Sequence, residues 1–233
     1  MKTQYLLGAY VALGCSAPQT NPTPDAGGVA DTGADVQPED TGLPPPTGVE
    51  GCAGGQTSVH NYPAGPYGIN PGDTVADFCL QGYLSWNQQT LVPMALHDYF
   101  DWAGASGNSV LFLSAGMTWC GPCNSEATQL PQVSKNMAGK GAVIFQVLLD
   151  GPTYGVGSTE MDLIAWLNKY KFPFWEVMDP MRITASYFPT PHPPALIIDM
   201  KTMHVLKGLH GYETVAQLTT LLTNCVNDQT SCN

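Results

Sequence analysis

The sequence contains few basic residues. Lys and Arg together number 8 among 233 residues, against 19 Asp and Glu, so the formal net charge is −11. A nucleic-acid partner requires clustered Lys and Arg to neutralise phosphates, and these basic residues form no cluster in the sequence. We therefore exclude nucleic acid as a partner and expect the acidic balance to serve solubility. Hydrophobic residues make up 43% of the chain, which is enough for a packed core.

Residues 16–50 lack both basic and aromatic side chains. A chain of this composition cannot bury enough apolar surface to offset the entropy that it loses on ordering. We interpret residues 15–50 as a disordered, acidic, Pro/Gly-rich tether and residues 51–233 as the folded domain. The acids of this stretch are Asp25, Asp31, Asp35, Glu39, Asp40 and Glu50.

The apolar run at the N-terminus is too short to span a bilayer as a helix, which needs about 20 residues. The run, from Tyr5 to Leu13, fits the apolar part of a secretory signal instead. Gly14 and Cys15 follow it, and the arrangement resembles a bacterial lipoprotein signal, in which the Cys becomes the lipidated first residue after cleavage. We predict a signal peptide at residues 1–14, a lipid on Cys15, and a place in the bacterial cell envelope facing the periplasm or the outside. The alternative is a plain signal peptide cut nearby, with Cys15 incidental.

Export predicts an oxidising compartment, in which structural disulfides form. Of the 7 cysteines, four remain when Cys15 and the close pair Cys120 and Cys123 are set aside. An even remainder fits two structural disulfides, and three pairings are possible. We predict Cys52–Cys79 and Cys225–Cys232, which make the smallest demands on the chain; four buried free thiols are the alternative.

Apolar runs and helical periodicity alternate along the folded region. Continuous apolar runs at residues 109–115 and 142–150 predict strands buried on both faces. Residues 195–200 and 204–209 predict an antiparallel pair, and residues 74–85 an N-terminal hairpin. Helices are predicted at residues 125–138, with a kink at Pro131, at 158–170, with a capping box at Ser158 or Thr159, at 214–225, and as short turns at 96–100 and near 181–188. This order predicts an α/β fold with helices on both faces of the sheet.

The segment Cys120-Gly121-Pro122-Cys123 directly follows the first predicted core strand. The helix dipole and free N–H groups stabilise a thiolate on a Cys at the start of a helix. Gly121 lets the turn close, Pro122 suits the first helical turn, and the second Cys can reach the first sulfur. The pair can therefore switch between dithiol and disulfide, with Cys120 as the attacking thiolate and Cys123 as the resolving thiol.

Other uses of two close cysteines fit this sequence less well. A zinc site usually needs two such pairs, and the sequence has no second C-x-x-C. A purely structural disulfide across two residues closes too small a loop to stabilise much. A peroxidase of the peroxiredoxin type would have Thr or Ser three positions before its Cys and Pro seven before, where this chain has Met117 and Leu113. We therefore predict redox exchange and no metal site.

The motif W-C-G-P-C at residues 119–123 resembles that of the thioredoxin superfamily. Together with Glu126 it matches the W-C-x-P-C-x-x-E pattern of the exported TlpA/ResA-like branch. The resemblance covers about residues 72–224. It implies a thioredoxin-like fold: a central mixed sheet with helices on both faces and an N-terminal β-hairpin extension. The chain departs from thioredoxin itself at Ser114, where thioredoxin has a buried Asp.

The resemblance also implies roles for the neighbours of the two cysteines. Trp119, Gly121 and Pro122 would shape the surface on which a substrate docks; a purely structural core position is the alternative for Trp119. Glu126 would relay a proton to Cys123. The alternative for Glu126 is an exposed first-turn acid favoured by the helix dipole.

The superfamily further places a cis-proline opposite the cysteines, where its backbone pairs with the substrate chain. Pro193 lies six residues before Asp199, which is the spacing of the branch, and Pro194 is the alternative. His192 would then face the sulfurs, where it would tune the thiolate or help to bind a soft metal; a solvent-facing loop position is the alternative. The remaining histidines show no ligand spacing and are expected at the surface: His60, His97, His204 and His210.

Functions of two different classes follow from these residues. The first is a thiol–disulfide oxidoreductase of the cell envelope, which needs no cofactor, exchanges disulfides with exported proteins and is reset by a membrane redox partner. The second is a copper-binding protein or metallochaperone with Cys120, Cys123 and His192 as ligands. The Gly-Pro dipeptide favours the first. A thioredoxin-fold interaction domain with an idle disulfide is a third possibility.

Overall fold

A computed structural model describes residues 62–88, 90–189 and 192–232. The chain divides into two units, Met1–Glu39 and Asp40–Asn233, and the described residues all belong to the second. The predicted signal peptide, the lipid on Cys15 and the tether therefore lie outside the described residues, as do Cys52 and His60. Within the described ranges, no helix is long and apolar enough to cross a membrane.

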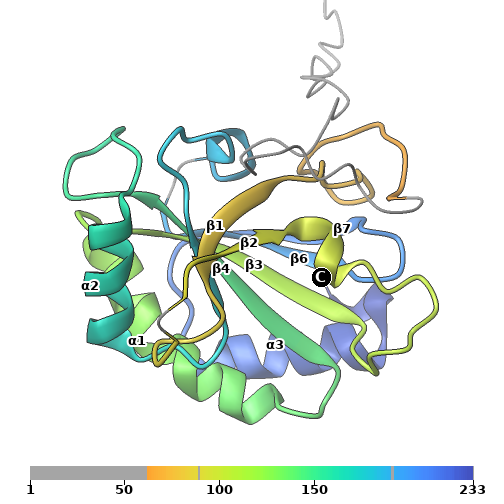
Figure 1. Cartoon of the computed structure of the whole chain (residues 1–233). Coiled ribbons are helices and arrows are strands. Elements are labelled where there is room, and N and C mark those ends of the chain that lie inside the picture. Colours follow the sequence, from red (N-terminus) through yellow and green to blue (C-terminus); the bar gives the residue numbers. More distant parts are fainter. Residues whose placement is uncertain (1–61, 89, 190–191, 233) are drawn as a thin grey trace, which may run out of the picture. The chain divides into compact units, whose positions relative to one another are not determined.

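A seven-stranded mixed sheet organises this unit, with the strand order β2-β1-β5-β4-β3-β6-β7 (Figure 1). β3 is parallel to β4 and antiparallel to β6, and β4 is parallel to β5. β1 is antiparallel to both β2 and β5, and β7 is antiparallel to β6. The predicted mixed sheet is confirmed. Its strands are β1 (Cys79–Tyr83), β2 (Val92–Ala95), β3 (Val110–Met117), β4 (Ala142–Asp150), β5 (Trp175–Met178), β6 (Pro194–Asp199) and β7 (Val205–His210).

The central strand β3 is buried along its whole length. Its side chains alternate between two hydrophobic clusters: Val110 and Phe112 join the cluster on one face of the sheet, and Leu111 and Leu113 join the cluster on the other. Burial on both faces is the reason that β3 and its neighbour β4 are continuous apolar runs in the sequence. The carboxyl end of β3 leads into the segment with the two cysteines.

Three α-helices cover one face of the sheet: α1 (Gly121–Met137), α2 (Glu160–Tyr170) and α3 (Val215–Asn227) (Figure 1). The connections β3-α1-β4 and β4-α2-β5 cross the sheet in the same direction. Because such crossovers are right-handed, both helices lie on the same face. The other face packs against the 3₁₀ helices η1 (Leu96–Tyr99) and η2 (Ala185–Tyr187). The expected helices on both faces are thus present, but all three α-helices share one face.

Local chemistry accounts for several element boundaries. The hydroxyl of Thr159 accepts the amide of Asp162 while the Asp162 carboxylate accepts the amide of Thr159, so Thr159 rather than Ser158 closes the predicted capping box. α1 continues through Pro131 as one helix. β1 and β2 form the predicted hairpin, although its second strand lies beyond residue 85. β5, within residues 172–179, was not predicted.

Of the four cysteines other than Cys15, Cys120 and Cys123, three form disulfides in the structure. Cys225 is bonded to Cys232, with an S–S distance of 2.03 Å, which confirms that pairing. Cys79 is also disulfide-bonded, and its predicted partner Cys52 lies outside the described residues. The alternative of buried free thiols is therefore wrong for Cys79, Cys225 and Cys232.

Candidate redox site

Cys120 and Cys123 lie where β3 gives way to α1 and are joined by a disulfide of 2.01 Å. Cys120 is the N-cap of α1, and its sulfur accepts the amide N–H of Cys123 at 3.1 Å. Pro122 occupies the first turn, where its missing N–H costs nothing. Cys120 is 4% and Cys123 1% exposed, whereas Gly121 between them is exposed. The positive end of the helix therefore points at Cys120, which favours a thiolate on that sulfur.

Trp119, directly before the pair, is half-buried. Its indole N–H donates to the Oδ2 atom of Asp150 at 3.0 Å. Its ring packs edge-to-face against Tyr154 and His192, with centroid distances of 5.0 and 5.6 Å. Trp119 is thus neither a fully buried core residue nor a free surface ring, and it joins the cysteine segment to two other loops.

The peptide bond between His192 and Pro193 is cis, as predicted for Pro193 rather than for Pro194. His192 is half-buried against Trp119, so the alternative of a solvent-facing loop histidine is wrong. Its Nδ1 atom is buried and has no hydrogen-bond partner in the part of the chain that the structure describes. Burial lowers the pKa of His192, the charge of Arg182 adds to this effect, and the charge of Asp150 opposes it. His192 thus favours its neutral form.

Glu126 lies on α1 three residues after Cys123, so the two side chains share a helix face. It is only 5% exposed, and the alternative of an exposed first-turn acid is wrong. Burial raises the pKa of Glu126 to about 8, with a contribution from the negative charge of Glu213. Its Oε1 atom is buried without a hydrogen-bond partner among the described residues. Glu126 is therefore a buried acid that can exchange a proton near neutral pH.

A scan against protein families matches residues 71–207, more than half of the chain, to the AhpC/TSA family. The chain belongs to the AhpC/TSA family. It is a thioredoxin-like oxidoreductase, and the predicted thioredoxin-like α/β fold is confirmed. No curated protein matched the chain.

Solved structures with a similar fold include the reduced 2-Cys peroxiredoxin of Plasmodium vivax, with a TM-score of 0.52 at 12% identity over 67% of this chain and 82% of that one. A thiol:disulfide interchange protein DsbE of Chlorobium tepidum has a TM-score of 0.48 at 22% identity, over 66% and 98% of the two chains. The pneumococcal exposed lipoprotein thioredoxin of Streptococcus pneumoniae has a TM-score of 0.47 at 20% identity, over 63% and 98%.

Two residues that contact the site of this AhpC/TSA-family protein were missed from the sequence. Asp150 ends β4 and accepts the Trp119 indole, and Arg182 donates from its Nε atom to Asp150 at 2.8 Å. An acid that directly ends a buried strand is a usable signal for Asp150, because the carboxyl ends of neighbouring parallel strands meet at one edge. Arg182 carries no such signal, since only the fold brings its loop to this edge.

No hydrogen bond, ion pair or ring contact joins the other described histidines to Cys120 or Cys123. His204 and His210 are exposed, as predicted. His97 is not a surface residue: its side chain is 11% exposed and its Nδ1 atom lies 2.8 Å from the carboxylate of Asp77. Burial raises the pKa of Asp77, and the contact with His97 opposes that rise. This pair supports η1 rather than the redox site.

Among residues 62–88, 90–189 and 192–232, no group of three or more His, Cys, Asp or Glu side chains is placed to hold a metal ion. The copper hypothesis needs Cys120, Cys123 and His192 to form such a group.

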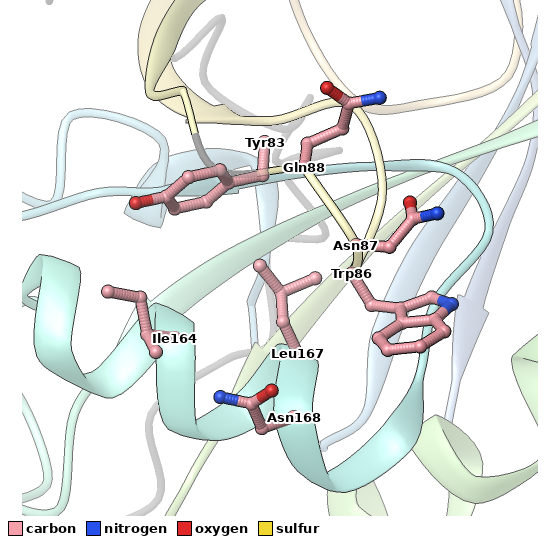
Figure 2. A pocket seen from close by; sticks show the side chains of 7 residues that line it. All are labelled: Tyr83, Trp86, Asn87, Gln88, Ile164, Leu167 and Asn168. Atoms are coloured by element: carbon pink, nitrogen blue, oxygen red, sulfur yellow. The ribbon is translucent and has the colours of Figure 1, made fainter.

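A cavity of about 510 Å³ lies between the β1–β2 loop and α2 (Figure 2). Trp86 and Tyr83 line it from the hairpin side, and Ile164, Leu167 and Asn168 line it from α2. It contains none of the residues of the redox site. This cavity is therefore separate from the segment that carries Cys120 and Cys123.

Proposed function

We propose that this protein is an exported thiol–disulfide oxidoreductase of the TlpA/ResA-like type, which exchanges disulfides with proteins outside the cytoplasm. The observation that carries the proposal is Cys120 at the N-cap of α1, with the Cys123 amide donating to its sulfur. These contacts stabilise negative charge on the sulfur that must attack. A peroxidase reaction is not favoured, because Met117 stands where a peroxidatic site has Thr or Ser.

Exchange proceeds in two balanced steps. The Cys120 thiolate attacks one sulfur of a client disulfide, so that a Cys120–client bond forms and the other client sulfur leaves as a thiolate. Cys123 then gives up its proton and attacks the Cys120 sulfur, which forms the Cys120–Cys123 disulfide and releases the second client thiolate. The client is reduced by two electrons and this protein is oxidised by two. A membrane redox partner reverses the change with the same chemistry.

Glu126 accepts the proton of Cys123 in this scheme. Its pKa of about 8 lies close to that of an ordinary thiol, so a proton can pass in either direction near neutral pH. Its position one helical turn after Cys123 brings the two side chains to the same face of α1.

Trp119 and His192 form the surface beside the disulfide on which a client chain docks, together with the exposed backbone at Gly121 and Pro122. The segment at cis-Pro193 lies beside Trp119 through the contact with His192. A client strand passing this edge would place its sulfur at Cys120.

Attachment to the membrane completes the proposal. A signal peptide at residues 1–14, a lipid on Cys15 and a tether at residues 15–50 would hold the oxidoreductase at the cell envelope. The pattern of the N-terminal sequence supports this placement. Cys15→Ser should move the protein from the membrane fraction to the soluble fraction, and a wild-type protein that is already soluble after export would contradict the lipid anchor.

Trapping of clients tests the exchange chemistry. Cys123→Ser removes the resolving thiol, so Cys120 should remain bonded to exported proteins. These complexes should appear on a non-reducing gel and disappear when the sample is treated with dithiothreitol. The double variant Cys120→Ser/Cys123→Ser is the control and should trap none. Equal complexes in both variants, or none in either, would overturn the proposed function. A titration of the reduced protein with Cu(I) tests the copper alternative, which requires tight binding that is lost in His192→Ala.

A further inference from the structure

The carboxylate of Asp150 is 1% exposed and accepts hydrogen bonds from three different segments. Its Oδ2 atom accepts the indole N–H of Trp119 at 3.0 Å and the amide of Gly155 at 2.9 Å. Its Oδ1 atom accepts the Nε–H of Arg182 at 2.8 Å. One buried group thus ties the cysteine segment, the loop after β4 and the loop after β5 to the end of β4.

The loop that carries Arg182 is itself held in place. The carboxylate of Asp179 accepts the amides of Ile183 and Thr184 and the hydroxyl of Thr184. Arg182 has the left-handed backbone conformation, with φ of 55°, which a non-glycine residue adopts only when its surroundings enforce it. These contacts direct the side chain of Arg182 toward β4, where it compensates the charge of Asp150.

The two loops that meet at this ion pair also expose large apolar side chains. Tyr154 is 68%, Val156 54% and Met181 80% exposed. The loops lie in contact, since a Cβ atom on Gly157 would be 2.3 Å from the carbonyl oxygen of Pro180. Tyr154 in turn packs against Trp119. The ion pair therefore holds one end of an apolar surface next to Cys120.

We infer that Asp150 and Arg182 are a positioning pair for client binding: they hold Trp119 and the loops at residues 151–157 and 179–184 in the arrangement that a client polypeptide meets. This inference rests on the proposed exchange with proteins. The client segment that fits is an extended chain with apolar side chains beside its cysteine, because the exposed rim is apolar and Arg182 is already neutralised by Asp150.

Removal of Arg182 leaves Asp150 as a buried charge without its cationic partner. A buried charge of this kind is costly, and the loops must open or the carboxylate must take up a proton to relieve it. Either change loosens the hydrogen bond to Trp119. Removal of both charges is less disruptive, because no uncompensated charge remains.

The test measures the reduction of insulin by dithiothreitol with the full-length protein as catalyst. Arg182→Gln should raise KM for insulin by about tenfold with kcat changed by less than about twofold, since the reacting sulfurs are untouched. Arg182→Lys should restore part of the loss, and Asp150→Asn/Arg182→Gln should be closer to wild type than Arg182→Gln alone. Lys140→Gln, at the opposite end of α1 from the disulfide, is the control for loss of one positive charge.

Three kinetic outcomes would overturn the inference: an unchanged KM in folded Arg182→Gln, an equal fall in kcat and kcat/KM, or additive effects in the double variant. If Arg182→Gln does not fold, Arg182→Lys and the double variant decide the same question. The fluorescence of Trp119, taken as the difference from Trp119→Phe, is independent of turnover and should change in Arg182→Gln but not in Lys140→Gln. If wild-type protein reduces no insulin, the proposed function fails, whereas unchanged Trp119 fluorescence in Arg182→Gln overturns the positioning pair.

Discussion

The two disulfides with both cysteines in the described part of the chain are almost equally buried but lie at opposite ends of helices. Cys120 and Cys123 are 4% and 1% exposed, and Cys225 and Cys232 are 0% and 1% exposed. Cys120 caps the N-terminus of α1, whereas Cys225 lies in the last turn of α3. The partial positive charge at the first site stabilises a thiolate and the partial negative charge at the second opposes one. Burial alone therefore does not separate an exchange site from a structural bridge.

The second disulfide also closes a turn that side-chain hydrogen bonds support. Asp228 begins the 3₁₀ helix η3 (Gln229–Ser231), and its carboxylate accepts hydrogen bonds from the amide of Thr230 and from the hydroxyls of Thr230 and Ser231. These contacts keep Cys232 near Cys225. The two disulfides thus differ in the helix end at which they lie and in the hydrogen bonds around them.

Loss of the attacking sulfur is the largest effect that we expect. Cys120→Ser should reduce insulin reduction to the uncatalysed rate, because a hydroxyl cannot replace the thiolate nucleophile. Cys225→Ser should keep most of the activity per folded molecule. Similar losses of activity in the two variants would contradict this difference between the two disulfides, because they would place part of the chemistry at the second one.

The buried acid beside the first disulfide should make stability depend on pH. Burial raises the pKa of Glu126 from an unfolded value near 4.5 to about 8, so the folded protein holds the proton more tightly than the unfolded chain. Stability is then fully present below about pH 4.5 and falls as pH rises toward 8, by on the order of a few kcal/mol.

Glu126→Gln should flatten this dependence, measured as urea unfolding at several pH values. Glu176 is fully buried and its pKa lies well above its usual range, so it also makes stability fall as pH rises. The difference between wild type and Glu126→Gln therefore isolates the contribution of Glu126. An identical slope in the two proteins would refute the assignment.

Removal of the second disulfide should lower the stability of the protein but leave its activity unchanged. Cys225→Ala/Cys232→Ala opens a short loop and should lower the free energy of unfolding by about 2 kcal/mol in the chain-entropy model, with insulin reduction retained. Urea unfolding of oxidised wild type and variant measures the difference. A variant with wild-type stability would show that the hydrogen bonds of Asp228 hold the turn by themselves.

The helix ends themselves should produce the smallest effect. In the fully reduced protein, a mild alkylating agent at pH 7 should modify Cys120 before Cys225, since the dipole contributes about 0.3–1 kcal/mol to each thiolate with opposite sign. Mass spectrometry of timed samples taken without denaturant, so that both helices stay folded, gives the order. Faster modification of Cys225 would contradict the explanation by helix ends.

The sequence alone determined the features that depend on neighbouring residues. The C-x-x-C at a strand–helix junction, the buried strands β3 and β4, a capping box for α2 at Ser158 or Thr159 and the Cys225–Cys232 bridge were all predicted, because propensity, capping and short loops act over a few residues. Pro193 was identified from spacing within a resemblance, and the cis bond before it agrees. β5 was missed because four residues in an aromatic-rich stretch carry no clear period.

Tertiary structure decided what depends on residues far apart in the chain. It buried Glu126 and half-buried His192, which the sequence left open as exposed alternatives, and it paired His97 with Asp77 rather than leaving it at the surface. It placed all three α-helices on one face of the sheet and brought Arg182 to Asp150 and Asp150 to Trp119. Burial and ion pairing are properties of the assembled sheet edge, where β3, β4 and β5 end beside one another, and no local pattern encodes that meeting.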